Sequence, residues 1–219
     1  MQIIYSFLKG IALGTFVTFL GFFFDVTFSR RSYKKLLEKS EQLLNKAIPA
    51  IQFNLMIIGP TVYGFVDYFL LEHNYTIQPM NILGVLSIHS IGYYIVHYAM
   101  HKSTYLYKLH SFHHEFDKVL IPSIGNAVSK GEFIIAYVTP FVTSAYILNL
   151  SEASFLIPVG IISVMNLVIH CKEFENIPYS KYFVSPKNHI MHHEVREKHF
   201  AAPTINIDYL FTGILPADG

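Results

Sequence analysis

The chain has 219 residues, 52% of them hydrophobic and only 14% charged, whereas charged residues make up about a quarter of a soluble domain. The formal net charge of +1 gives no reason to expect nucleic acid as a partner. A single cysteine, Cys171, excludes an intramolecular disulfide framework and any zinc site built from several cysteines. The composition therefore predicts an integral membrane protein.

Five apolar segments that are nearly free of charged residues follow one another along the chain, at 3–28, 47–71, 77–100, 133–150 and 153–170. A membrane-crossing helix needs about 20 mostly apolar residues, with about 17 as a practical minimum, so all five qualify, the last two narrowly. The first could also be a cleaved signal peptide. We favour a retained span, because no small-x-small cleavage site follows Phe24 and the basic run comes after the apolar stretch. We expect an all-α integral membrane protein with four or five transmembrane helices.

The segment 29–46, between the first two apolar segments, is amphipathic. Charged residues separate four leucines at helical spacing, which are Leu36, Leu37, Leu43 and Leu44. This pattern predicts a helix that lies at the membrane interface.

Lysine and arginine divide the connecting segments into two sets. Of the 16 basic residues, all but Lys9 lie in 29–46, 101–132 and 171–219, while 72–76 and 151–152 contain none. With five spans the three basic segments share one side of the membrane, and the positive-inside rule identifies that side as the cytoplasm. Eleven of the twelve histidines then lie on or near that side, His73 being the exception. The shortness of 151–152 predicts a tight antiparallel hairpin between the last two spans.

Histidines gather in three clusters, the first of which lies at the end of the third apolar segment. His97 and His101 form H-x-x-x-H, and two H-x-x-H-H clusters follow, at 110–114 and 189–193. Residues three and four apart share a helix face, so each cluster directs two or three imidazoles to one point. Eight such nitrogens suit two metal ions, although imidazole binds Fe, Zn, Cu and Ni alike. Solvated interfacial histidines are the plain alternative. A metal transporter is another, but transporters place their ligands near the bilayer midplane.

The order and spacing of these clusters resemble the fatty acid hydroxylase/sterol desaturase superfamily over roughly residues 89–213. The stretch HYAMHKSTYLYKLHSFHH is similar to the first two histidine boxes of that family, and HFAAPTINIDYLFTG to its closing segment. His170 stands where the family has a further histidine before the last box. The resemblance implies a cytoplasmic helical cap with a dimetal site whose ligands are His97, His101, His110, His113, His114, His170, His189, His192 and His193.

Membership of this family would imply a di-iron oxygenase that uses O2 to hydroxylate or desaturate a membrane lipid. Sterol and fatty acyl substrates both stay open. Electrons would come from a separate donor such as cytochrome b5 or a reductase, because the chain leaves no room for a fused heme segment. The resemblance also implies the endoplasmic reticulum membrane if the source is eukaryotic. Residues 1–76 would then be anchor helices with the interfacial helix, and residues 77–219 the catalytic domain.

Several positions depart from the family pattern. Phe174 stands where some members have a second histidine, His199 replaces an asparagine of the closing motif, and Ala201 replaces a glycine. These departures leave open a non-catalytic metal-binding or metal-transporting protein, or a degenerate lipid-binding member. Additional ligands, or residues that orient a ligand, could be His89, His199, Asn166 and Asp208.

The remaining charged residues are given structural or surface roles. Asp67, inside the second apolar segment, is expected to form a structural pair on the side away from the metals. The others are expected to be solvated or ordinary interfacial charges, and these are Glu115, Glu194, Lys130 and Glu132. His73, on the opposite side, is expected to take no part in the chemistry.

Overall fold

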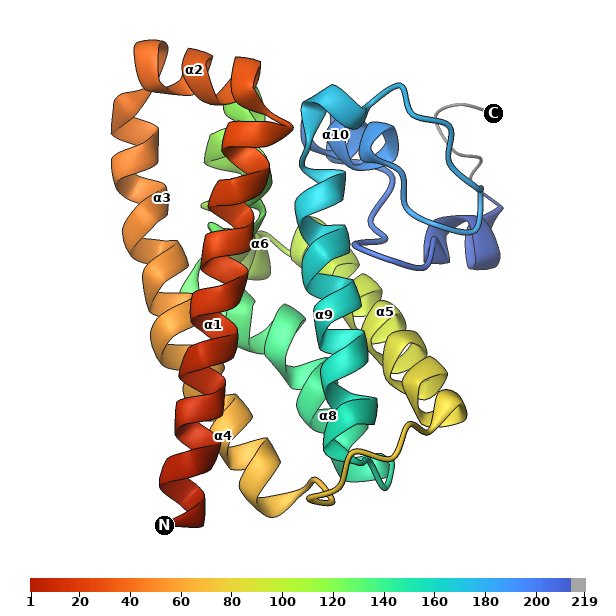
Figure 1. The fold of residues 1–219 in the computed structure, drawn as a ribbon. Coiled ribbons are helices and arrows are strands. Elements are labelled where there is room, and N and C mark those ends of the chain that lie inside the picture. The colour runs from red at the N-terminus through yellow and green to blue at the C-terminus, as the bar shows by residue number, and fades with distance from the viewer. Residues whose placement is uncertain (214–219) are drawn as a thin grey trace.

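Four long apolar helices organise the protein, whose computed structural model describes residues 1–213 (Figure 1). The helices that are long and apolar enough to cross a membrane are Gln2–Thr27, Glu41–Phe69, Pro79–Lys102 and Glu152–Ile169. Every regular element of the described range is helical. This confirms the predicted all-α membrane fold, in which four helices of the described range meet the length and apolarity of a span. The last residues of the predicted domain 77–219, from 214 on, lie outside the described range.

The first two spans pack side by side and are joined by a short helix. After α1 (Gln2–Thr27), α2 (Arg30–Lys39) crosses one end of the molecule, and α3 (Glu41–Phe53), η1 (Asn54–Ile58) and α4 (Gly59–Phe69) return along α1 (Figure 1). The interfacial helix predicted over 29–46 is therefore longer than the helix that the structure shows, α2. The helix breaks at Ser40, and Glu41 already begins the second span.

The surface of α1 is inverted relative to that of a soluble helix. Its buried positions include Gly10 and Gly14, while Phe16 and Phe19 are exposed. Small residues between helices and large apolar residues outside are the pattern of a helix that faces lipid.

The fourth apolar segment is helical but not uniform. It consists of α7 (Lys130–Glu132), the π-helical η4 (Phe133–Val138) and α8 (Thr139–Ile147), and it is not among the four long apolar helices. Both η4 and the earlier π-helical segment η1 end just before a proline in the first turn of the next helix, Pro140 and Pro60 respectively. Proline lacks an N–H and its ring clashes with the carbonyl four residues before it, so a wider turn relieves the contact.

The two connections without basic residues lie together at one end. The N–H of Glu72 donates to the carbonyl of Leu150 over 2.9 Å, and the N–H of Ser151 donates to Gln78 Oε1 over 3.1 Å. The connection between α8 and α9 (Glu152–Ile169) is 148–151, longer than predicted but still tight. This end lies opposite α2 and α10, as the charge pattern predicts (Figure 1). That the other end faces the cytoplasm stays a prediction.

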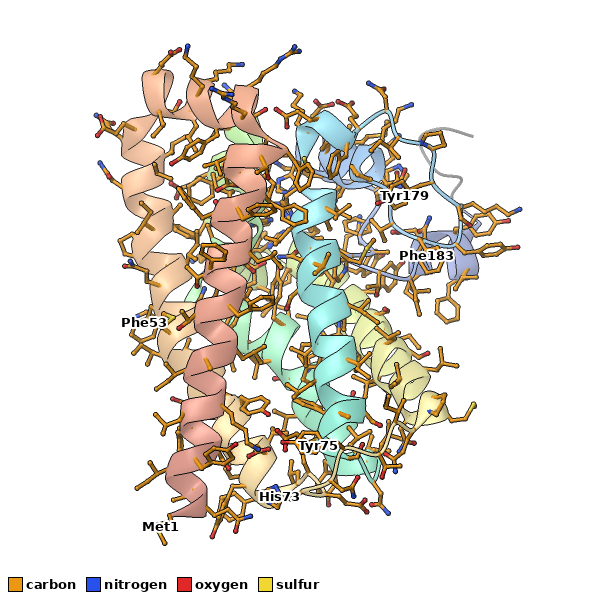
Figure 2. All side chains as sticks on the ribbon, viewed as in Figure 1. Met1, Phe53, His73, Tyr75, Tyr179 and Phe183 are labelled. Carbon is orange, nitrogen blue, oxygen red and sulfur yellow. The ribbon has the colours of Figure 1, made fainter. Side chains whose placement is uncertain are left out.

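A cap of short helices covers the other end of α5 (Pro79–Lys102) and α9. Its elements are α6 (Thr104–His110), η2 (His113–Val119), η3 (Pro122–Asn126), η5 (Lys172–Phe174), α10 (Pro186–Val195) and η6 (Asp208–Thr212). Figure 2 shows Tyr179 and Phe183 in this cap, and His73 and Tyr75 at the opposite end with Met1.

Candidate metal centre

The first two histidine clusters are positioned by the end of α5 and the turn that follows it. His97 and His101 lie one turn apart in the last two turns of α5. Ser103 ends that helix and caps α6, because its side chain accepts the N–H of Leu106. His110 is the last residue of α6, and His113 and His114 begin η2, so the chain folds back over the end of α5.

The third cluster lies on α10. Ser185 accepts the N–H of Asn188, and Pro186 occupies the first turn, where its missing N–H costs nothing. The helix carries His189, His192 and His193 and ends at Val195, and Arg196 caps it in a left-handed conformation with φ of 62°. His170 follows the last residue of α9 and comes to the same place from below.

The structure brings all nine predicted ligands together in two adjacent groups. Within each group, one possible ligand atom from every residue lies within 4.8 Å of the others. The five-histidine group consists of His97, His101, His110, His114 and His192. The four-histidine group consists of His113, His170, His189 and His193. Eight of the nine are buried, and only His101 is partly exposed. Each group could hold one metal ion.

Backbone carbonyls orient four of the rings. The Nδ1 of His97 donates to Phe200 over 2.7 Å, and that of His170 donates to Asn166 over 2.7 Å. The same contact joins His192 to Lys198 over 2.9 Å and His113 to Ala127 over 3.3 Å. Because a carbonyl can only accept, the proton is on Nδ1 and the Nε2 lone pair is free.

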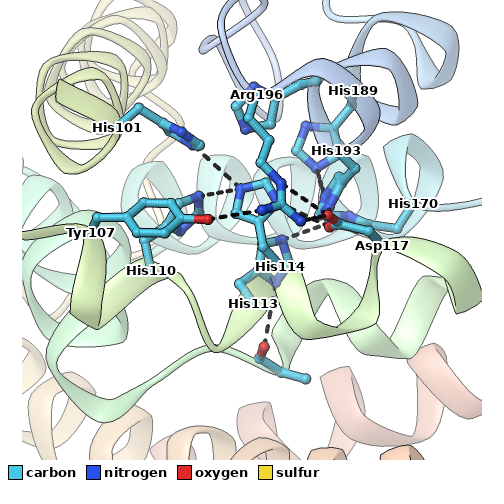
Figure 3. A network of polar contacts seen from close by, with 12 residues as sticks. His101, Tyr107, His110, His113, His114, Asp117, His170, His189, His193 and Arg196 are labelled. Atoms are coloured by element: carbon cyan, nitrogen blue, oxygen red, sulfur yellow. Dashed lines mark hydrogen bonds and ion pairs between the residues drawn. The ribbon is translucent and has the colours of Figure 1, made fainter. Parts of the chain in front are cut away.

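Two carboxylates orient three more rings. Glu132 Oε1 lies 2.7 Å from Nδ1 of His110. Asp117 Oδ1 contacts one histidine of each group, because it lies 3.0 Å from Nδ1 of His114 and 2.7 Å from Nδ1 of His193 (Figure 3). The other oxygen of Asp117 accepts from Arg196, whose Nη1 donates to Tyr107. Contacts of this kind fix the ring and raise its basicity as a ligand.

The Nε2 atoms converge at distances that fit a bound cation. They are 3.0 Å apart in His97 and His110, and 2.9 Å apart in His170 and His189. Where Nδ1 carries the proton, as in His97 and His170, Nε2 presents a lone pair to its neighbour. A neighbour in the other tautomer would donate its Nε2–H to that lone pair, whereas a neighbour that also carries its proton on Nδ1 could share a cation with it. The donor set therefore fits metal ions bound through Nε2.

Burial keeps these rings in the neutral form that binds metal. It lowers the pKa of His170 from 6.5 to about 4. It also lowers, well below 6.5, the pKa of five further cap histidines, which are His110, His113, His189, His192 and His193. Burial raises the pKa of Glu132, whereas a cation on the far nitrogen of His110 would favour its carboxylate form.

The four additional candidates lie around the groups and belong to neither. His89 is buried deeper in α5 with its ring against Phe141, and His199 is buried with φ of 60°. The amide of Asn166 donates to Asn126 Oδ1 over 3.2 Å. Asp208 accepts the N–H of Ala201 over 2.7 Å. It thereby holds the backbone beside Phe200, the residue that orients His97.

The structure confirms the expected surroundings of three other carboxylates. Asp67 pairs with Lys9 over 3.2 Å, Glu115 pairs with Lys46 at the surface, and Glu194 is exposed. His73 is exposed at the far end (Figure 2), and that it takes no part in the chemistry stays a prediction.

The expectation for Glu132 is wrong. Lys130 is exposed over the ring of Phe53, but Glu132 is buried against His110. The sequence pattern that could have pointed to Glu132 is Ser129-x-x-Glu132, which is typical of a helix start. In the structure the side chain of Ser129 accepts the N–H of Glu132. Asp117 was also missed, although its position three residues after His114 was readable.

Comparison with known families gives one match. The family model described as fatty acid hydroxylase matches residues 82–213, a range that contains all nine histidines and both carboxylates. Comparisons with curated proteins and with solved structures find no match.

Proposed function

This chain belongs to the fatty acid hydroxylase family, and from that premise we propose that it hydroxylates or desaturates a membrane lipid with O2 at a histidine-held di-iron centre. The observation that carries the proposal is the pair of adjacent histidine groups, with most Nδ1 atoms already occupied and the Nε2 atoms converging. Their position at the end of the spans suits a substrate dissolved in the bilayer.

Iron held there would supply the activation of O2 towards an unactivated C–H bond, which no side chain achieves alone. The protein's own part is to hold the rings in one tautomer and to keep the groups dry. In a hydroxylation one oxygen atom enters the product and the other leaves as water. Two electrons are therefore needed from outside, and we propose a separate donor such as cytochrome b5 or a reductase.

We further propose that the cap faces the cytoplasm, where such a donor is found. The concentration of basic residues at the cap end supports this orientation. For a eukaryotic source the endoplasmic reticulum is the expected membrane.

The first test is the metal content of protein purified in detergent. We expect about two irons per chain, from the two groups of about four ligands each, and loss of both in His113→Ala/His192→Ala, which removes one ligand from each group. His73→Ala, at the far end, is the control and should keep its iron. A folded wild-type protein without metal would leave a lipid-binding member as the better account.

The second test follows oxygen from 18O2 into lipid extracts of cells that express the protein. Incorporation in the wild type but not in the double variant supports hydroxylation, and a new double bond without label supports desaturation. A protein that exchanges divalent metals and consumes no O2 would instead be a metal carrier.

A further inference from the structure

An apolar cavity lies in the membrane part of the bundle, beneath the metal groups. Its volume is about 130 Å³, and it is lined by residues of α1, η1–α4, η3, η4–α8 and α9. Representative lining residues are Leu13, Val62, Phe141, Val159 and Ile162. One side of the cavity is formed by α1 and by η1–α4. Both lie before residue 82 and so outside the range that the family match covers.

The upper end of the cavity reaches the neighbourhood of the metal groups. Asn166 and Asn126 line this end, and the carbonyl of Asn166 accepts from His170. Gly125, next to Asn126, lies against the imidazole of His170 so closely that a Cβ there would come within 2.6 Å of Nδ1. The cavity therefore approaches a ring of the four-histidine group.

The lower end is lined by two aromatic rings, which lie next to a charged cluster. Tyr63 and Phe155 line the cavity with ring centroids 6.3 Å apart. Below them Lys9 bridges Asp67 at 3.2 Å and Glu152 at 2.8 Å, and so ties α1, α4 and α9 together. An apolar group pushed past the rings would have to displace buried charges from one another, which is costly.

The dimensions fit one narrow chain. Phe155 and Asn166 are eleven residues apart on α9, a distance of about 16 Å at the rise of an α-helix. An extended alkyl chain rises about 1.3 Å per carbon, so this length accommodates about a dozen carbons. A water-sized group needs about 10–15 Å³, so 130 Å³ holds about ten such groups. Spread over the length between Phe155 and Asn166, this volume leaves room for little more than one narrow chain.

We propose that this cavity holds the unbranched hydrocarbon tail of the substrate, with its end at Tyr63 and Phe155, and that it limits the tail to about a dozen carbons below the metals. The inference rests on the proposed function and narrows it, because a fused-ring sterol is too wide for a single-file space. Chain length would then be selected by the N-terminal helices together with α8 and α9.

Val159→Phe tests the proposal by filling the cavity partway down α9. Purified protein is photolabelled with a fatty acid that carries a diazirine on its terminal carbon. Unlabelled lauric acid, caprylic acid and cholesterol are then compared as competitors of this labelling. In the wild type we expect lauric acid to compete best and cholesterol not to compete. In Val159→Phe the preference should shift towards the shorter caprylic acid by about tenfold, since methylenes lose their burial. Val164→Phe, the same change on the lipid-facing side of α9, should behave as the wild type.

The sites of labelling give a second measurement on the wild type, which holds even if Val159→Phe fails to fold. Labels on Tyr63 or Phe155 support the proposal. Labels confined to the lipid-facing residues Ile157 and Ile161, or displacement by cholesterol, would overturn it. Neither readout needs turnover. Labelling at the cavity end without any oxygenation would refute the proposed function alone, while oxygenation with unshifted chain preference would refute the cavity.

Discussion

Asp117 connects the two histidine groups. One of its oxygens faces His114 of the five-histidine group and His193 of the four-histidine group, and the other is held by Arg196. The carboxylate is mostly buried, and it orients one ring of each group at the same time. A change at this position should therefore affect both proposed metals together.

Replacing Asp117 by alanine should weaken metal binding while leaving the ligands in place. Loss of an orienting partner of this kind typically costs about 10–100-fold in affinity. The measurement is the iron that the protein retains against a series of chelator concentrations, with thermal melting as a check on folding. Glu115→Ala, two residues away on the same helix and exposed, is the control. Equal retention in Asp117→Ala and Glu115→Ala would contradict the role given to Asp117.

At the scale of single residues, the sequence predicts the candidate histidine ligands better than it predicts the residues that orient them. The three- and four-residue spacings select which histidines share a helix face, and the structure gathers all nine. Whether they bind metal stays a prediction. Glu132 could not be assigned to His110 from spacing, because 22 residues separate them and a cap of short helices decides the contact.

At the scale of elements, the contact between α1 and the second span depends on missing side chains. A Cβ on Gly14 would lie 1.9 Å from the carbonyl oxygen of Leu55, and one on Gly10 would lie 2.8 Å from Cα of Pro60. Apolarity predicts the spans themselves. It does not reveal which helices touch, nor the break at Ser40, because both depend on tertiary packing.

Gly14→Ala should therefore destabilise the bundle. The added methyl meets backbone that cannot rotate away, and forced overpacking usually costs about 1–3 kcal/mol. The melting temperature in detergent should fall, with loss of tail binding as α1 moves off the cavity. Gly160→Ala on α9 is the matched control, since nothing lies within 4 Å of its added Cβ. An unchanged melting temperature in Gly14→Ala would show that the helices pack less closely than described.

At the scale of the whole molecule, charge and apolarity predict the arrangement of ends correctly. The connections without basic residues meet at one end, and the histidine cap lies at the other. The cavity and the ion cluster beneath it could not be read from the sequence. Lys9, Asp67 and Glu152 come from three segments far apart in the chain, and only the packed bundle joins them.

The buried histidines should make the metal-free protein sensitive to acid. Unfolded histidines take up protons near pH 6.5, whereas burial lowers the pKa of the folded His170 to about 4 and also lowers the pKa of five further cap histidines, His113 and His192 among them. Below pH 6.5 the unfolded state therefore binds more protons, and stability falls as the pH falls. We expect the melting temperature of the metal-free protein to drop by several degrees between about pH 7 and about pH 5. His113→Ala/His192→Ala removes two of these groups and should show a shallower drop, so parallel curves would contradict the argument.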